Sequence, residues 1–228
     1  MSTSDETPKT NLKIDSQFAL STKQASDGYL LLRQESERGS VLVGGAMLDE
    51  MLGAILKAFF VGDKKLIKEL LYGPNAPAAT FSSRIRLCRA IGLITDEVYR
   101  DLDRIRSIRN KAAHFNRRGE KGFDFTFKDP EISDECRALK TFSDVDRSEL
   151  PPRILFEAFV TIVAGVLKEH AIAMRLVGDN LGESSARELM YELLPTVDIR
   201  GHLQKLCDSV RELLRSAELT KTEIERKD

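Results

Sequence analysis

Apolar residues recur at alternating steps of four and three along most of this 228-residue chain, and this spacing most constrains its fold. In residues 29–61 the recurring positions are Val41, Gly45, Leu48, Leu52, Ile55 and Phe59. Such a stripe is typical of the core-facing side of an α-helix, so we expect one long helix over residues 29–61. Helical spacing returns in residues 81–91 and 95–114, and residues 154–177 are apolar almost all round. We therefore expect an all-α fold, an antiparallel helical bundle.

Cap residues and chain breakers predict where these helices begin and end. The expected N-caps are, in order along the chain, Asp63, Thr80 or Ser82, and Thr95. Gly92 is expected to stop the helix of residues 81–91, and prolines at 130 and 151–152 are expected to begin two later helices. Phe123, Phe125 and Phe127 alternate with polar residues, which predicts one short extended aromatic segment.

Composition along the chain predicts three parts. Residues 1–27 are polar and lack sustained periodicity, as is typical of a flexible N-terminal segment. Residues 28–177 are expected to form the helical domain. Residues 178–228 are expected to form a linker, beginning with Gly178–Gly182, and a C-terminal helical extension. The final amphipathic helix would carry Leu203, Leu206, Val210 and Leu213 at heptad-like spacing.

Charge and cysteine usage predict a soluble cytoplasmic protein. The formal net charge of −1 gives no global argument for nucleic-acid binding. The cysteines at 88, 136 and 207 are widely spaced and odd in number, so neither a disulfide framework nor a cysteine zinc site is indicated. The N-terminus has no apolar signal region, and the longest uncharged apolar run, residues 158–167, is far short of a bilayer span. We expect no membrane role.

The candidate site lies in residues 95–114. At about 100° per residue, the apolar residues of this segment fall in one stripe, and Arg109 lands inside it. Burial of a guanidinium is unfavourable unless a carboxylate pairs with it. Asp49 lies at the edge of the apolar stripe of residues 29–61. We therefore predict a structural ion pair between Asp49 and Arg109.

A second stripe of this helix predicts a binding surface. Its members are Tyr99, Asp103, Arg106, Asn110 and His114. Six basic residues and no acidic residue lie between Arg104 and Arg118, so a phosphate-facing patch is one interpretation. The candidate binding residues of that patch are Arg106, Lys111, Arg117 and Arg118. An ordinary solvated helix face explains the same pattern equally well, and the sequence does not decide between the two.

Five segments, in their order and spacing, carry a likeness to a known family. They are residues 46–52, 73–85, 90–102, 105–114 and 127–132. Together they resemble the mannitol operon repressor family of bacterial helical proteins, over roughly residues 34–168. The resemblance implies an all-helical domain and the regulation of a sugar operon. The part of the chain after Val177 lies outside it.

A narrower resemblance concerns residues 109–114, which are similar to the R-polar-x-x-x-H motif of HEPN domains. These helical bundles occur in prokaryotic RNase toxins, and many members are non-catalytic interaction modules. The resemblance implies catalytic roles for Arg109, Asn110 and His114 in metal-independent RNA cleavage. A histidine can act as acid or base near neutral pH, and an arginine can bind the phosphate.

The sequence leaves two functional hypotheses. His170 and His202 lie on separate helices without a motif, so a two-histidine ribonuclease would need His114 from both chains of a homodimer. Asn110 occupies the position where a metal site would place a second ligand for His114, so we predict no metal and no cofactor. No helix-turn-helix is evident, and direct DNA binding is not expected. The first hypothesis is a homodimeric regulator acting through a regulatory protein partner or RNA; the alternative is a HEPN-type endoribonuclease, a toxin with a composite site at a dimer interface.

Overall fold

The computed structural model describes residues 27–60, 63–114, 125–141 and 150–181. Within these ranges the chain forms helices and no strand, which confirms the all-α prediction. The helices are α2 (Glu37–Phe59), α3 (Lys64–Leu71), α4 (Phe81–Ala90), α5 (Asp96–Ala113), α6 (Pro130–Arg137) and α7 (Pro152–Leu181). Residues 27–34 form a further short helix before α2.

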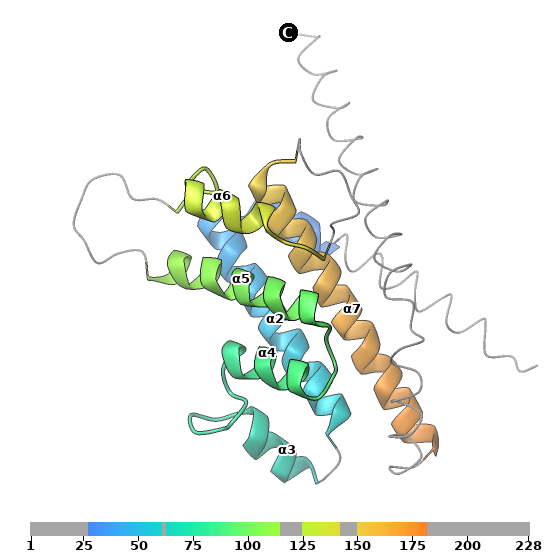
Figure 1. The fold of residues 1–228 in the computed structure, drawn as a ribbon. Helices are drawn as coiled ribbons and strands as arrows, with labels where there is room; N and C mark the ends of the chain where they lie inside the picture. Colours follow the sequence, from blue (N-terminus) through green and yellow to red (C-terminus); the bar gives the residue numbers. More distant parts are fainter. Residues whose placement is uncertain (1–26, 61–62, 115–124, 142–149, 182–228) are drawn as a thin grey trace, which may run out of the picture.

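Helix α2 is the centre of the bundle. It packs along α7 and is crossed by α5 and α4, while α3 lies at its C-terminal end (Figure 1). Leu48, Leu52 and Ile55 are fully buried in this arrangement. A Cβ atom built on Gly44 would lie 3.1 Å from the ring of Phe156, so this glycine allows α7 to approach α2 closely.

By length and composition alone, α2 is also apolar enough to cross a membrane, with a mean hydropathy of 1.4 over its best window. Half of that window is buried inside the bundle, against α4, α5 and α7. The core helix of a globular domain passes the same test, and the burial of Leu48, Leu52 and Ile55 is that of a core helix.

The predicted helix boundaries are confirmed at most positions. The side chains of Asp63, Thr80, Thr95 and Asp129 each accept a backbone N–H at the start of the helix that follows. The single long helix expected over residues 29–61 is wrong, because the chain leaves the helix at Glu35. Helix α2 begins again after Ser36, whose hydroxyl accepts the backbone N–H of Gly39 at 3.0 Å.

An arginine of α7 explains this break. The guanidinium of Arg153 donates to the backbone carbonyls of Leu32 at 3.1 Å and Glu35 at 2.7 Å, which are the carbonyls that a continuing helix would use. Its Nε atom donates to Glu157 at 2.6 Å, and that fully buried carboxylate also accepts the hydroxyl of Ser40 at 3.0 Å. The pair of Arg153 and Glu157 on α7 therefore holds residues 27–35 through Arg153 and the start of α2 through Glu157.

The aromatic segment and the end of α7 differ from the prediction in detail. Phe125 and Phe127 are buried with their rings edge to face at 5.5 Å, and Phe127 packs on Phe156, but the segment forms no strand in the described residues. Phe123 lies outside the described residues. Helix α7 continues to Leu181, so the linker predicted from Gly178 does not begin there. The expected C-terminal helix lies outside the described residues.

Candidate functional site

Helix α5 carries the predicted site, and its sequence explains both of its ends. The hydroxyl of Thr95 accepts the N–H of Val98 at 3.3 Å. Two acidic residues follow in the first turn, where their negative charges interact favourably with the helix dipole. The helix ends at His114, whose backbone N–H donates to the carbonyl of Asn110 at 3.0 Å. The residues that attach α5 to the core are Leu102, Ile105, Ile108 and Ala112.

Only the aliphatic part of the Arg109 side chain lies along the apolar stripe of α5, and its guanidinium group does not. Its side chain is exposed and crosses Gly45 of α2, where an added Cβ would lie only 2.8 Å from Cγ of Arg109. Its Nη1 atom donates to Oδ1 of Asn110 at 3.3 Å. The aliphatic part of an arginine covers apolar surface while its guanidinium stays in water. The predicted ion pair between Asp49 and Arg109 is therefore wrong.

Asp49 pairs instead with Arg84 of α4, at 2.9 Å. Arg84 is 7% exposed, and each of its three nitrogens is used. Nη1 also donates to the carbonyl of Asp49, Nε donates to the carbonyl of Ala78, and Nη2 donates to that of Leu71, all at 3.0 Å. Gly53 makes room for this group, since a Cβ there would lie 3.1 Å from Nη1. Arg84 thus joins α2, α4, the end of α3 and the loop after it.

The sequence contained a signal for Arg84 that our prediction did not use. Arg84 follows Phe81 by three residues and precedes Cys88 by four, so it also falls within the apolar stripe of its helix. The same holds for Asp101 of α5, which is fully buried. Its Oδ2 atom accepts the backbone N–H groups of Lys140 and Thr141 at 2.7 Å and the hydroxyl of Thr141 at 2.6 Å. This carboxylate fixes the chain after α6 to α5.

Acidic side chains accompany most of the basic residues of α5. The ion pairs are Arg100 with Asp96 (2.7 Å), Arg104 with Glu135 (2.9 Å), Arg106 with Asp103 (2.8 Å) and Lys111 with Glu131 (2.6 Å). Helix α5 has five basic and four acidic residues, and α6 has one basic and three acidic, so together they have a net charge of −1. Arg109 forms no ion pair with a described residue. The predicted binding residues Arg117 and Arg118 lie outside the described residues.

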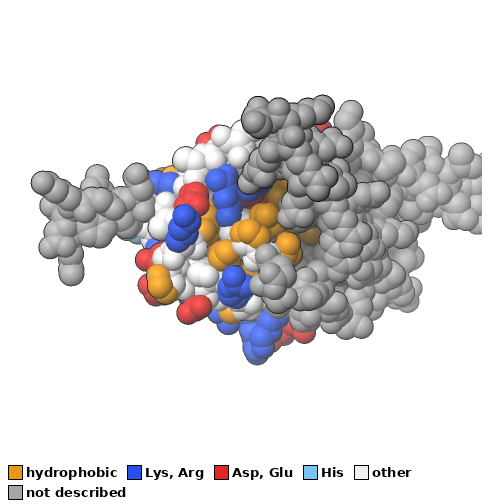
Figure 2. Space-filling model, turned by 90° about the horizontal axis from the view of Figure 1, so that it is seen from above, with side chains coloured by type: hydrophobic (Ala, Val, Ile, Leu, Met, Phe, Trp, Pro, Cys, Tyr) orange, Lys and Arg blue, Asp and Glu red, His pale blue; other side chains and the backbone are white. Residues whose placement is uncertain are grey.

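A mixture of charges is also visible on the top of the molecule. Figure 2 shows basic and acidic side chains next to one another there, with hydrophobic side chains between them, and not one continuous basic field. Nucleic-acid backbones are bound by cations that gather on one face. On the face that Figure 2 shows, the described side chains therefore form no continuous basic surface.

The three residues of the R-polar-x-x-x-H motif share the C-terminal end of α5. Arg109 and Asn110 are hydrogen-bonded to each other, and the side chain of His114 is exposed at the helix end. His170 is buried in α7, and His202 lies outside the described residues. Within the described residues no three His, Cys, Asp or Glu side chains gather as metal ligands would. The arrangement supplies hydrogen-bond donors and one imidazole on an open surface.

Comparison with known proteins identifies the family of the chain. A family model described as MtlR, mannitol repressor, matches residues 31–154, which is more than half of the chain. The matched part includes α2 to α6 and the first turn of α7. Neither a curated protein nor a solved structure matches the chain.

Proposed function

Because the chain belongs to the mannitol repressor family, we propose that it is a repressor-type regulator of a sugar operon that acts through a protein contact. The proposed contact lies on the C-terminal half of α5 and is here called the α5 surface. It consists of the exposed Arg109 and His114 and the partly buried Arg106, Asn110 and Lys111. In this proposal the protein does not bind operator DNA by itself.

The observation that carries the proposal is the ion pairing of α5. A protein that binds a nucleic-acid backbone gains affinity when its cations replace the counterions of the phosphates. Arg106 and Lys111 already have Asp103 and Glu131 beside them, and these carboxylates would repel a phosphate. A protein partner, in contrast, can match both signs of charge across an interface.

Arg109 supports a protein contact in a second way. Its stem is held against Gly45, while its guanidinium is exposed and makes one hydrogen bond, to Asn110. Arginine is enriched among the residues that dominate protein–protein binding energy, because its rigid planar group makes several hydrogen bonds at once. A partly pre-organised arginine on a mixed-charge surface is therefore suited to a protein contact.

The alternative function is a HEPN-type endoribonuclease. The observation that favours it is the grouping of Arg109, Asn110 and His114 at one helix end. RNA cleavage by this route requires an acid and a base, and each chain places one histidine at this end in the described residues. The alternative therefore requires a homodimer that brings His114 of both chains to one phosphate.

Expression from the controlled operon, measured with a reporter, tests the proposal. We compare Arg109→Glu with Arg86→Glu, a matched change at an exposed arginine of α4 that lies outside the α5 surface. We expect Arg109→Glu to lose most of the repression and Arg86→Glu to keep it, with equal amounts of folded protein. Purified protein is expected not to retard the operon promoter in a gel-shift assay. Specific promoter binding that survives physiological salt would contradict the proposal.

The ribonuclease alternative has its own test. Purified protein is incubated with RNA in EDTA, beside a His114→Ala variant whose thermal unfolding matches the parent. A ribonuclease would degrade the RNA and lose this activity in His114→Ala. We expect no degradation by either protein, and RNA cleavage that depends on His114 would replace our proposal with the alternative.

A further inference from the structure

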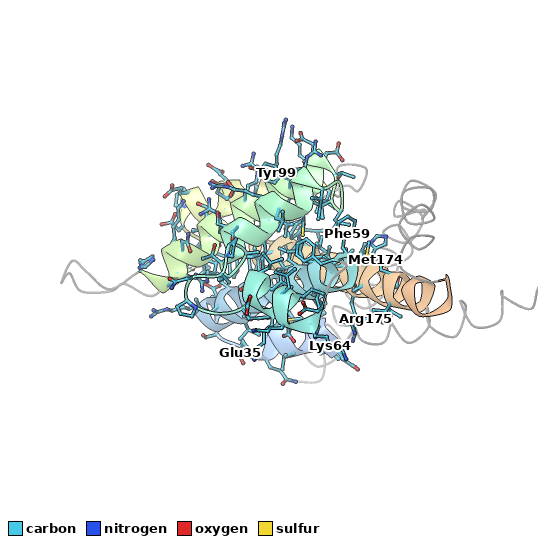
Figure 3. All side chains as sticks on the ribbon, turned by 90° about the horizontal axis from the view of Figure 1, so that it is seen from below. Glu35, Phe59, Lys64, Tyr99, Met174 and Arg175 are labelled. Carbon is cyan, nitrogen blue, oxygen red and sulfur yellow. The ribbon has the colours of Figure 1, made fainter. Side chains whose placement is uncertain are left out.

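A basic cavity lies where α3 packs on α2, and none of its described lining residues belongs to the α5 surface. It has a volume of about 690 Å³ and is lined by Lys57 of α2, by Lys64, Ile67 and Lys68 of α3, and by Tyr72. Figure 3 shows Lys64 on the opposite side of the bundle from Tyr99 of α5. We propose that this cavity binds the phosphate ester of a small organic molecule.

Charge is the first argument. Three of the five described lining residues are lysines, and none is acidic. None of the three lysines forms an ion pair with a described residue, whereas most basic residues of α5 do. Like charges around one concave space repel one another and raise the local concentration of anions. Lysine is a common phosphate ligand in proteins, where its ammonium acts as a compact point charge.

Local structure places these cations together. Lys64 and Lys68 are four residues apart on α3 and therefore share one face of the helix, with Ile67 beside them. Asp63 forms no ion pair with either lysine, and its carboxylate caps α3 by accepting the backbone N–H groups of Lys65 and Leu66 at 2.8 and 2.9 Å. Lys64 and Lys68 therefore line the cavity from successive turns of α3, while Lys65 of the first turn lies outside it.

The remaining walls indicate an organic part of the ligand. Tyr72 lies under Arg84, with the guanidinium carbon 5.5 Å from the ring centroid, and Arg84 is itself fixed by Asp49 and two backbone carbonyls. The aromatic wall is therefore attached to the buried framework by a cation–π contact. Ile67 adds an apolar surface. A cavity of this size is within the range of small-molecule sites and is larger than one phosphate ion needs.

Binding to the full-length protein tests the proposal by isothermal titration calorimetry in physiological salt. The probes are glucose 6-phosphate and glycerol 3-phosphate, with glucose, glycerol and inorganic phosphate as comparisons. We expect at least one ester to bind, and to bind at least tenfold more tightly than inorganic phosphate or its own unphosphorylated form. Failure of both esters at 10 mM would overturn the proposal, as would equal affinity for inorganic phosphate.

Variants locate the site. The double variant Lys64→Gln/Lys68→Gln is expected to weaken ester binding at least tenfold, while Lys65→Gln, an exposed lysine of α3 outside the cavity, leaves it unchanged. All three lysines are exposed, and circular dichroism with thermal unfolding verifies that each variant is folded. Equal weakening by Lys65→Gln would show general charge attraction and overturn the site. Binding of an acidic peptide or an oligonucleotide without any ester binding would also overturn it.

Discussion

Arg84 of α4 lies 2.9 Å from the carboxylate of Asp49 on α2, and this pair holds three helices and a loop together. The two partners differ in burial, with 9% of the Arg84 side chain exposed and 33% of the Asp49 side chain. The guanidinium also satisfies the carbonyls of Ala78 and Leu71, which have lost contact with water. The arginine is therefore the more important member of the pair.

Substitution of the two partners should have unequal effects on stability. Arg84→Met leaves a carboxylate and buried carbonyls without their donor, and we expect it to lower the free energy of unfolding by about 3–5 kcal/mol. Asp49→Asn keeps a side-chain acceptor and the backbone carbonyl, so we expect a loss of about 1 kcal/mol. Urea unfolding measures both values. Equal losses in the two variants would argue against this division of roles.

The adjacent glycines of α2 provide a second prediction. A Cβ at Gly44 meets the buried ring of Phe156 at 3.1 Å and Val160 at 3.3 Å, and neither neighbour can move freely. We expect Gly44→Ala to lower stability by about 1–3 kcal/mol through overpacking. A Cβ at Gly45 meets the base of the Arg109 side chain, with Cγ at 2.8 Å and Cβ at 3.4 Å, so the stem of Arg109 must change its rotamer to make room.

Gly45→Ala should therefore be mildly destabilising, by about 1 kcal/mol, because the gain in helix propensity of up to about 1 kcal/mol offsets only part of the overpacking against the Arg109 stem. In an Arg109→Ala background the same change should be stabilising. Thermal unfolding of the single and double variants checks this coupling. If Gly45→Ala were as damaging as Gly44→Ala in both backgrounds, the position assigned to the Arg109 stem would be incorrect.

Substitution of Asp101 should have an effect that can be measured at two particular backbone amides. Replacement by Ala removes the acceptor for the N–H groups of Lys140 and Thr141 and leaves a cavity in the core. We expect a loss of about 2–3 kcal/mol in unfolding free energy. Hydrogen exchange should show the amides of these two residues losing protection. Unchanged protection at both amides would contradict the role of Asp101 as their acceptor.

Thiol chemistry tests the packing around α4 and α6. Burial raises the pKa of Cys88 and of Cys136 to about 12, from the usual 9.0, although Arg84 lowers the value for Cys88. Both thiols should be unreactive toward a thiol reagent at pH 8 in the folded protein and reactive in urea. A Cys207→Ser background restricts the measurement to these two. Rapid labelling of either thiol in the folded state would contradict its burial.

The same shifts predict a pH dependence of stability. Above pH 9 the unfolded thiols lose their protons while the folded ones keep them, so the folded state binds more protons. The contribution of these thiols is therefore complete below pH 9 and is lost as the pH rises from 9 toward 12. Replacing Cys88 with Ala in the Cys207→Ser background should make the alkaline loss of stability less steep, as measured by urea unfolding at pH 8 and pH 10.5.

Helical periodicity predicted most helices because apolar burial and capping are local in sequence. It could not predict the partner of Asp49. Periodicity gives the direction of a side chain from its helix, and Arg84 and Arg109 both point along apolar stripes. The difference lies in what each stem meets: Gly53 leaves space for a buried guanidinium, while Gly45 lies under a stem whose end reaches solvent. That distinction depends on the crossing of α4 and α5 over α2, which no single segment encodes.

The break before α2 shows the same limit. Ser36 followed by Glu37 is an ordinary cap signal, and no apolar side chain lies between Leu32 and Val41, but neither observation identifies the group that ends the first helical residues. The break is fixed by Arg153, more than a hundred residues later, which binds the carbonyls that end the first helical residues. The ion pairs of the basic run from Arg104 could not be predicted for a similar reason, since the acidic partners Glu131 and Glu135 come from α6.

Photo-crosslinking inside the cell tests most directly whether the α5 surface binds a protein. A benzophenone amino acid is placed at position 114 or, as the control, at position 86, and the products are treated with nucleases and identified by mass spectrometry. We expect position 114 to give a discrete protein adduct that survives nuclease treatment and disappears in Arg109→Glu, and position 86 to give none. An adduct from position 114 that is removed by ribonuclease, or the same adducts from both positions, would show that this surface is not a specific protein contact.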